Sequence, residues 1–265
     1  MTESAETRNK VVIGTPIDSG HAYVLDKFLE NLKLIQQEYP ASELVLATSE
    51  KDYALKLKGI LRSAHVQGTV LVHTPQKPDY ARHWIWDVTS GREAIRRYAA
   101  SQTGADYLFF LDGDTLCQPD IIARLLKHID GCDAVFNGCA LRQGGTGLAG
   151  AGCLMLSRRA FEGVNFRCCE FPSGEVIFED NMLEMDLFRL GARIKKGIYA
   201  PTDHYQDARS FQRVEAQPVG KIRTLVNHPF IRYVLIKASV ALRYNFPWRL
   251  KLFLDRLRRG AKKGH

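Results

Sequence analysis

Two aspartates directly follow a short apolar run in the segment YLFFLDGDTL, residues 107–116. Only Gly113 separates Asp112 from Asp114, and two carboxylates this close repel each other unless a cation lies nearby. Carboxylate oxygens suit Mg²⁺ or Mn²⁺, which proteins commonly bind with one or two carboxylates and the phosphates of a substrate. The pair therefore indicates a metal and phosphate site, although Asp and Gly are also common in plain turns.

The elements that must position this pair alternate between apolar runs and amphipathic segments. We expect strands, with helices between them, at residues 10–16, 43–48, 69–74 and 107–111. Ser90 and Glu93 form a capping-box pattern, which predicts a helix that begins there and ends at Gly104. Alternation of this kind predicts an α/β fold, with a mostly parallel sheet and helices on both faces. Ligands bind such sheets at the carboxyl ends of the strands, where the two aspartates lie.

The second half of the chain continues this alternation less regularly. Its expected helices and strands lie at residues 120–130, 134–138, 153–157, 158–164, 179–191 and 192–200. A glycine-rich loop, QGGTGLAGAG (143–152), precedes the strand at 153–157. The loop lacks the GK[ST] ending of a phosphate-binding P-loop, which excludes that type of nucleotide site.

In this order, the motifs resemble those of a nucleotide-sugar glycosyltransferase of the GT-A fold, closest to the family 2 type. FLDGDT (110–115) matches its DxD motif, and TSGREAIRRYA (89–99) resembles its helix with an arginine that faces the nucleotide. AGAGCLMLSRRAFEGV (149–164) resembles its glycine-start strand, and FEDNMLEMDLFRLGARI (178–194) resembles its Glu-Asp helix. The histidine of TDHY (202–205) stands where many members carry a third metal ligand. The resemblance covers residues 10 to 206, although GTPIDSG replaces the commoner signature after the first strand.

The resemblance implies a role for particular residues. It implies Mn²⁺ or Mg²⁺ as cofactor, held by Asp114 and His204 with the assistance of Asp112. The residues implied to bind the nucleotide sugar are Pro16, Asp18, Arg92, Asp112, Gly113 and Asp114. Those implied to contact the acceptor are Gly152, Glu179 and Trp84. For Arg92, Asp18 and Trp84 the alternatives are a solvated helix residue, a helix cap and a cover for the core edge.

Asp180 is the residue that the resemblance implies as the catalytic base of an inverting reaction. It stands at the expected start of a helix, where the helix dipole stabilises a carboxylate and lowers its pKa. We therefore expect Asp180 to be ionised at pH 7 and to be a modest base. The alternative for Glu179 and Asp180 is an ordinary acidic helix cap.

The formal charge of +8 is concentrated at the C-terminal end of the chain. Residues 221–265 hold twelve Lys and Arg and one acid, Asp255. Apolar residues recur there at helical spacing, which predicts basic amphipathic helices that bind an anionic membrane surface. The alternative is a helical pair packed on the domain with a basic outer face. Nucleic-acid binding is not expected, because no recognised motif accompanies the basic run.

Composition and cysteine spacing limit the remaining possibilities. We expect a disordered leader at 1–9, a catalytic domain at 10–210 with nucleotide-binding and acceptor halves at 10–116 and 117–210, and a helical tail at 211–265. The six cysteines include no CxxC pair, so a zinc ribbon is not expected. No secretory signal and no apolar run of the ~18 residues that cross a membrane are visible. These features predict reduced thiols and a cytoplasmic protein, peripheral on the inner face of the membrane.

The resemblance implies a metal-dependent, inverting glycosyltransferase of the hexosyltransferase type. It also implies a UDP-sugar as donor, because UDP is common for this fold, with a GDP-sugar as alternative. The expected acceptor is a lipid-linked glycan or surface-polysaccharide precursor. One alternative is a retaining enzyme of the same fold. Another is a non-catalytic protein that binds sugar nucleotides or forms a scaffold at the membrane surface. A sugar nucleotidyltransferase is disfavoured, because the strand at 10–16 leads into GTPIDSG.

Overall fold

A computed structural model describes residues 9–141, 145–171 and 174–245 of the chain. All but one residue of the expected leader, and the part of the expected tail from residue 246 onward, lie outside these residues. Seven strands form the central sheet, in the spatial order β12-β6-β9-β4-β1-β2-β3. Their bounds are Val11–Pro16 (β1), Ser42–Thr48 (β2), Gly68–Val72 (β3), Tyr107–Leu111 (β4), Ala134–Asn137 (β6), Cys153–Ser157 (β9) and Ile194–Gly197 (β12). The predicted α/β class with a mostly parallel sheet is confirmed.

One strand of the central sheet runs against the others. β9 pairs antiparallel with both β4 and β6, while the remaining neighbours are parallel. Its reversed direction brings the start of β9 to the edge where β4 ends, with Leu111 opposite Cys153. The backbone N–H of Asp112 extends the pairing, because it donates to the carbonyl of Gly152 at 3.0 Å.

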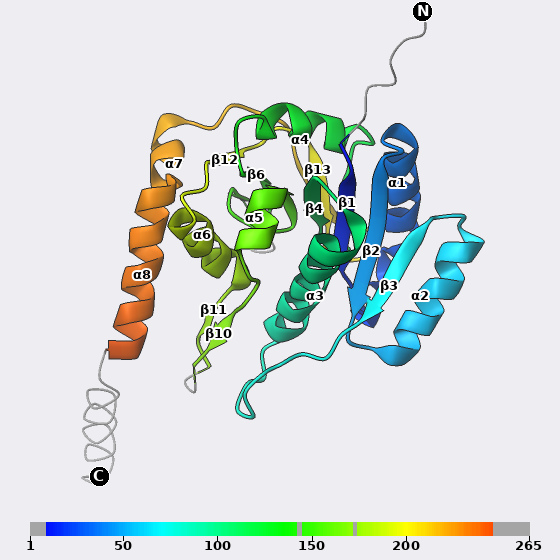
Figure 1. The fold of residues 1–265 in the computed structure, drawn as a ribbon, viewed down its shortest axis with the longest axis horizontal. Coiled ribbons are helices and arrows are strands. Elements are labelled where there is room, and N and C mark those ends of the chain that lie inside the picture. Colours follow the sequence, from blue (N-terminus) through cyan, green and yellow to red (C-terminus); the bar gives the residue numbers. More distant parts are fainter. Residues whose placement is uncertain (1–8, 142–144, 172–173, 246–265) are drawn as a thin grey trace, which may run out of the picture.

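Helices cover both faces of this sheet (Figure 1). One core contains the buried faces of α1 (Leu25–Glu38), α2 (Lys51–Ser63) and α4 (Ile121–Ile129). The other contains those of α3 (Ile85–Tyr98), α5 (Arg158–Gly163) and α6 (Glu179–Arg189). β4 supplies side chains to both cores, because its residues are apolar on both faces, as expected for a strand buried in a parallel sheet. This burial fixes the position at which Asp112 leaves the sheet.

The predicted start of the helix before β4 is wrong. α3 begins at Ile85, so Ser90 and Glu93 lie inside it and do not form a capping box. Instead, the Glu93 carboxylate accepts hydrogen bonds from Arg96, Arg97 and the backbone N–H of Phe166. The end is as predicted: a π-helical turn, η2 (Ala99–Thr103), follows α3 and stops at Gly104, whose φ of +63° suits glycine.

A second, smaller sheet was not predicted from the sequence. It is antiparallel, in the order β14-β13-β5, with bounds Phe211–Val214 (β14), Thr202–Tyr205 (β13) and Thr115–Cys117 (β5). The strand β13 was not predicted, and the predicted helical tail does not begin at residue 211, where β14 starts. The register places His204 opposite Thr115, the residue after Asp114. Two short hairpins complete the strands, β7 (Cys139–Ala140) with β8 (Thr146–Gly147) and β10 (Cys169–Glu170) with β11 (Val176–Ile177).

The chain continues into two helices at the side of the molecule away from α2 (Figure 1). α7 spans Lys221–Val226 and α8 spans Pro229–Asn245. α8 packs on α6, where the ring of Phe188 stacks on Tyr233 with centroids 4.5 Å apart. Within the described residues, no helix has both the length and the apolar character needed to cross a bilayer. Part of the predicted tail is thus packed on the domain, which is the alternative to a membrane-binding tail given above.

Candidate active site

The second aspartate of the pair lies against a histidine from a distant part of the chain. Asp114 and His204 are both largely buried, and Asp114 Oδ2 lies 3.2 Å from His204 Nε2. The β5–β13 pairing holds them together, and the backbone N–H of Tyr205 donates to the Asp114 carbonyl at 2.7 Å. The structure therefore brings together two of the three residues expected to bind a metal, ninety positions apart in the sequence.

The first aspartate is paired with Arg92 from α3. One guanidinium nitrogen of Arg92 donates to Asp112, and another donates to Glu179 at the start of α6. Arg92 is only 2% exposed, and the charges of Asp112 and Glu179 raise its pKa against the opposing effect of burial. A single buried cation thus connects the end of β4 with the start of α6, and three predicted site residues meet around it.

Two glycines allow this close packing. A Cβ on Gly152 would lie 2.5 Å from Asp112 Oδ2, so any side chain there would displace the carboxylate. A Cβ on Gly113 would lie 3.2 Å from the ring of His21 and 3.4 Å from Ile17. Gly152 therefore lies against Asp112, and the acceptor contact that the resemblance implies for it stays a prediction.

The pKa of Asp180 is raised, whereas the sequence predicted that it would be lowered. Loss of hydration and the nearby negative charge of Glu179 raise the pKa of Asp180 to about 7, although the N–H of Asn181 donates to its carboxylate at 2.6 Å. The expected lowering by the helix start is outweighed, because burial disfavours the charged form. Burial also raises the pKa of Glu179, despite its ion pair with Arg92. At pH 7 the Asp180 carboxyl is divided between its two forms.

The segment after β1 reaches the same edge and includes a residue that the sequence analysis missed. Asp18 caps the short helix η1 (Ser19–Tyr23), and its Oδ1 lies 2.8 Å from His21 Nδ1. The hydrogen bond with His21 lowers the pKa of Asp18. Asp18, Asp114 and Asp112 in turn raise the pKa of His21, against the effect of burial. The DSGH spacing, an acid followed by a histidine three residues later, was the available signal. Pro16 ends β1 and faces α3, where a Cβ on Gly91 would lie 3.0 Å from it.

The aromatic loop between β3 and α3 is held at one carboxylate. Glu170 on β10 accepts hydrogen bonds from the backbone N–H groups of Arg82 and His83 and from the indole N–H of Trp86. These bonds lower the pKa of Glu170. Trp84 is 58% exposed, and its ring centroid lies 6.3 Å from that of Phe178, two residues before Asp180. The predicted acceptor residue Trp84 thus lies near the start of α6 but is not part of the group formed by Arg92, Asp112 and Glu179.

The donor set can be compared with what a divalent metal requires. Asp114 and His204 offer one oxygen and one nitrogen at close distance, which fits Mn²⁺ or Mg²⁺ bound mainly by substrate phosphates and water. Asp112 is turned to Arg92 instead. In the part of the chain that the structure describes, no group of three or more His, Cys, Asp or Glu is arranged to hold a metal. Of the three residues expected to bind the metal, Asp114 and His204 lie together and Asp112 lies against Arg92.

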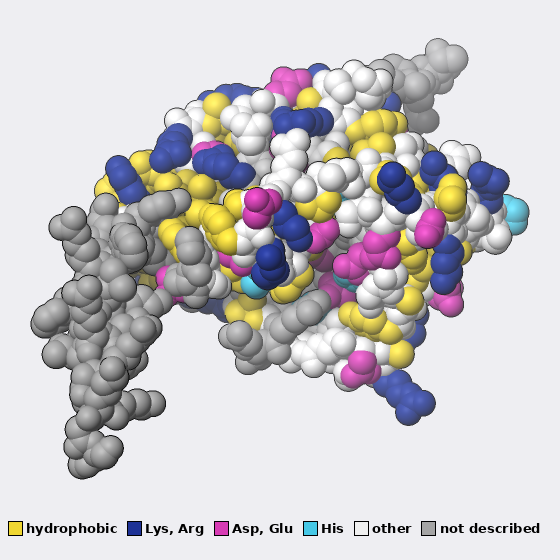
Figure 2. Space-filling view, turned by 90° about the horizontal axis from the view of Figure 1, so that it is seen from below, with side chains coloured by type: hydrophobic (Ala, Val, Ile, Leu, Met, Phe, Trp, Pro, Cys, Tyr) yellow, Lys and Arg dark blue, Asp and Glu magenta, His cyan; other side chains and the backbone are white. Residues whose placement is uncertain are grey.

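Acidic side chains gather near the middle of the face at which β3 and its parallel neighbours end. Figure 2 views the molecule from that end and shows the Asp and Glu side chains in magenta. All six cysteines lie in the described residues and are free, as predicted. Lys and Arg side chains, in dark blue in Figure 2, lie around these acids on the same face.

Comparison with known proteins shows which fold this is. No protein-family model matches the chain, and no curated protein matches its sequence. Among solved structures, it is similar to the mannosyltransferase PcManGT from Pyrobaculum calidifontis in complex with GDP-Man and Mn²⁺, with a TM-score of 0.52 and 16% identity over 98% of this chain and 77% of that one. S. aureus TarS 1-349 in complex with UDP-GlcNAc also matches, with a TM-score of 0.47 and 12% identity over 88% of this chain and 66% of that one. The chain has the GT-A-like fold of nucleotide-sugar glycosyltransferases.

Proposed function

We propose that the protein is a metal-dependent glycosyltransferase that moves a hexose from a nucleotide sugar to an acceptor hydroxyl. The observation that carries this proposal is the arrangement of two carboxylate pairs at one edge of a GT-A sheet. Asp114 lies against His204, and Arg92 connects Asp112 with Glu179 beside Asp180. Residues 10–116 would form the nucleotide-binding half and residues 117–210 the acceptor half.

The donor is expected to bind over Asp112, Gly113 and Asp114. Asp114 and His204 would hold Mn²⁺ or Mg²⁺, which when bound neutralises the charge of the leaving diphosphate. Asp18 and Pro16, at the end of β1, would contact the nucleotide, and Arg92 would fix the orientation of Asp112. The donor is a UDP-sugar in this proposal, with a GDP-sugar as the alternative. The similarity to a mannosyltransferase bound to GDP-Man and Mn²⁺ supports a donor of this class.

Asp180 would accept the proton of the acceptor hydroxyl, with inversion at the sugar carbon. A pKa near the working pH is favourable for a general base, because it combines a large deprotonated fraction with useful proton affinity. Glu179, Gly152 and Trp84 would shape the acceptor side. A product with the donor's anomeric configuration would instead support a retaining enzyme, in which Asp180 only binds the substrate.

The acceptor would be a lipid-linked glycan or a surface-polysaccharide precursor at the inner face of a membrane. α7 and α8 support this part of the proposal, because they expose large apolar side chains next to basic ones. Ile222 is 81% exposed and Phe230 is 56% exposed. Vesicles of anionic lipid should sediment the full chain, and added salt should reverse this. Equal sedimentation with neutral vesicles would contradict an electrostatic membrane surface.

Donor binding provides the direct test. With Mn²⁺ present, one member of a panel of nucleotide sugars should raise the melting temperature of the protein and be consumed when acceptor is added. Asp114→Ala should remove the shift. Asp203→Asn is the matched control, because Asp203 neighbours His204 but pairs with Arg213 near the surface at 3.2 Å. If no nucleotide sugar changes the melting temperature, the glycosyltransferase proposal fails and a scaffold role is favoured.

A further inference from the structure

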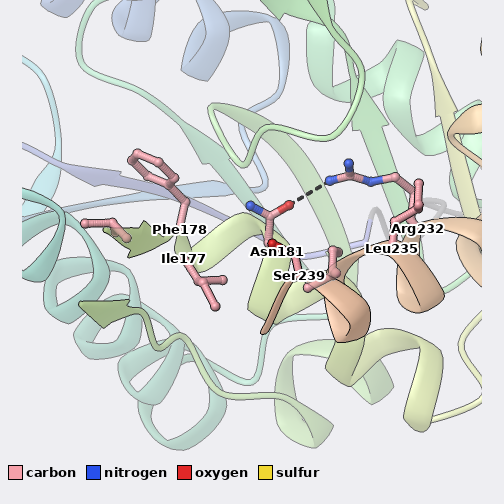
Figure 3. A pocket seen from close by; sticks show the side chains of 8 residues that line it. Ile177, Phe178, Asn181, Arg232, Leu235 and Ser239 are labelled. Carbon is pink, nitrogen blue, oxygen red and sulfur yellow. Dashed lines mark hydrogen bonds between the residues drawn. The ribbon is translucent and has the colours of Figure 1, made fainter. Parts of the chain in front are cut away.

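A pocket lies between α8 and the segment that leads into α6 (Figure 3). Its volume is about 300 Å³, at the lower end of the range for ligand pockets. The lining residues are Val176, Ile177, Phe178, Asn181, Arg232, Leu235, Ile236 and Ser239. Phe178 and Asn181 flank Glu179 and Asp180 in the chain. We call this cavity the α8 pocket; Asp180 does not line it, but its carboxylate accepts a hydrogen bond from the backbone N–H of the lining residue Asn181 at 2.6 Å.

Among the described residues that line the α8 pocket, apolar side chains outnumber polar ones and none is an acid. Five of its side chains are hydrocarbon or aromatic, two are neutral and polar, and Arg232 is the one cation among the described residues that line it. Apolar walls favour a hydrocarbon ligand, since each buried methylene adds binding free energy. The single positive charge favours an anionic group over a cationic one near the polar side.

Arg232 also fixes the wall of the pocket. It donates to Asn181 Oδ1 at 2.7 Å and to Glu184 Oε1 at 3.0 Å, as Figure 3 shows for Asn181. Glu184 is buried and forms a second ion pair with Lys196. Glu184 thus pairs with both Arg232 and Lys196, which holds the Arg232 side chain at the wall of the pocket. The α8 pocket is a built feature held from two helices.

The mouth of the pocket continues into exposed apolar surface. Phe178 is partly in solvent, and Leu235 is exposed with its neighbour Val234. Earlier in the chain, α7 and the start of α8 expose Ile222, Leu225, Val226 and Phe230. Exposed apolar surface that adjoins a pocket is typical of a binding region. A chain longer than the pocket could extend along these helices.

We infer that the α8 pocket binds the hydrocarbon chain of an amphiphilic acceptor, whose hydroxyl-bearing, neutral or anionic head group lies at Asp180. The inference rests on the proposed glycosyltransferase function and names the acceptor class for it. The pocket, with its volume of about 300 Å³, accommodates one hydrocarbon chain. Its position beside α6 explains how a chain held by α8 presents its head to the start of that helix.

The test titrates the full chain with n-alkyl β-glucosides of four to ten carbons, below the concentration at which they form micelles. Calorimetry should show that affinity rises about fourfold for each added methylene until the pocket is filled. Ser239→Trp fills the pocket and should abolish this dependence. Ala238→Trp is the matched control, because Ala238 is the exposed neighbour and does not line the pocket.

A second pair of variants covers the case in which Ser239→Trp does not fold. Leu235→Ser should weaken binding of the ten-carbon glucoside about tenfold or more, while Val234→Ser, an equally exposed neighbour outside the lining, should not. Octyl phosphate should bind more tightly than octylamine. Affinity that is independent of chain length, or equal loss in lining and control variants, would overturn the inference.

These titrations contain no nucleotide sugar, so they separate the two proposals. Loss of chain binding with donor binding intact would remove only the acceptor class. Chain binding without any response to nucleotide sugars would leave the α8 pocket as a lipid site and remove the transferase function.

Discussion

The molecule contains two pairs of acids that are close neighbours in the chain, and their negative charges are neutralised in different ways. Asp112 and Asp114 are separated by one glycine, and each turns to its own partner, Arg92 or His204. Glu179 and Asp180 are adjacent, and Arg92 is the cation that acts on both of them. The pKa values of both acids are nevertheless raised. A glycine between two acids thus lets them divide between two partners, whereas burial and mutual repulsion raise the pKa values of two adjacent acids at a helix start.

The largest effect should come from removing Arg92, the cation between the two pairs. Arg92→Ala leaves Asp112 and Glu179 without their buried partner and should lower the free energy of unfolding by about 3–5 kcal/mol. Urea unfolding measures this. Arg97→Ala on the same helix is the control, because Arg97 is 73% exposed and its pair with Glu93 should contribute no more than about 1 kcal/mol. Equal losses would show that Arg92 does not connect the pairs.

The next effect distinguishes the proposed base, Asp180, from the proposed donor-binding pair, Asp112 and Asp114. Asp180→Asn should lower kcat by about a hundredfold to a thousandfold, because a general base is lost, while the donor still raises the melting temperature. Initial rates with saturating donor measure this. Asp186→Asn, on the same helix but paired with Arg167, should keep most of the activity. Loss of donor binding in Asp180→Asn would place Asp180 on the donor side instead.

A smaller effect tests the packing of the first pair. Gly152→Ala places a methyl group against Asp112 and should displace its carboxylate, with a loss of about tenfold or more in kcat/KM. Gly150→Ala in the same loop is the control, because a Cβ there meets nothing within 4 Å. Unchanged kinetics in both variants would mean that Asp112 has room to move without consequence.

The smallest expected effect is on the pH dependence of kcat, which reports the raised pKa of Asp180. The base acts when deprotonated, so kcat should rise with pH, about tenfold per unit below 7, and level off above it. Glu179→Gln removes a negative neighbour that raises the pKa of Asp180, so the midpoint should move to lower pH. A midpoint that moves upward, or a profile without a midpoint near 7, would contradict Asp180 as the titrating base.

Much of the fold followed from the sequence because its signals are local. The run YLFFL is apolar on both faces, which predicted β4 and placed Asp112 and Asp114 at the edge of the sheet. The direction of β9 did not follow, since an apolar strand reads alike in parallel and antiparallel pairing. β5, β13 and β14 are three or four residues long and exist through their partners, so their residues gave no periodic signal.

The sequence predicted which residues belong to the candidate site, but it did not predict which of them contact one another. Arg92, Asp112 and Glu179 were expected separately, and only the fold shows that one arginine joins them. The Ser90–Glu93 pattern failed because Glu93 is used by Arg96, Arg97 and the Phe166 N–H inside a longer helix. The pKa of Asp180 was predicted in the wrong direction, because burial depends on segments that a local motif does not contain.

The attachment of the loop before α3 has a consequence for how specificity can diverge. Glu170 receives two backbone N–H groups of that loop, at Arg82 and His83, and one indole. Backbone donors are present whatever side chains the loop carries, so the path of the loop is largely independent of its sequence. Substitutions at the exposed Trp84 can therefore change the surface that this loop presents, and with it the acceptor in the proposed reaction, while the loop backbone remains in place.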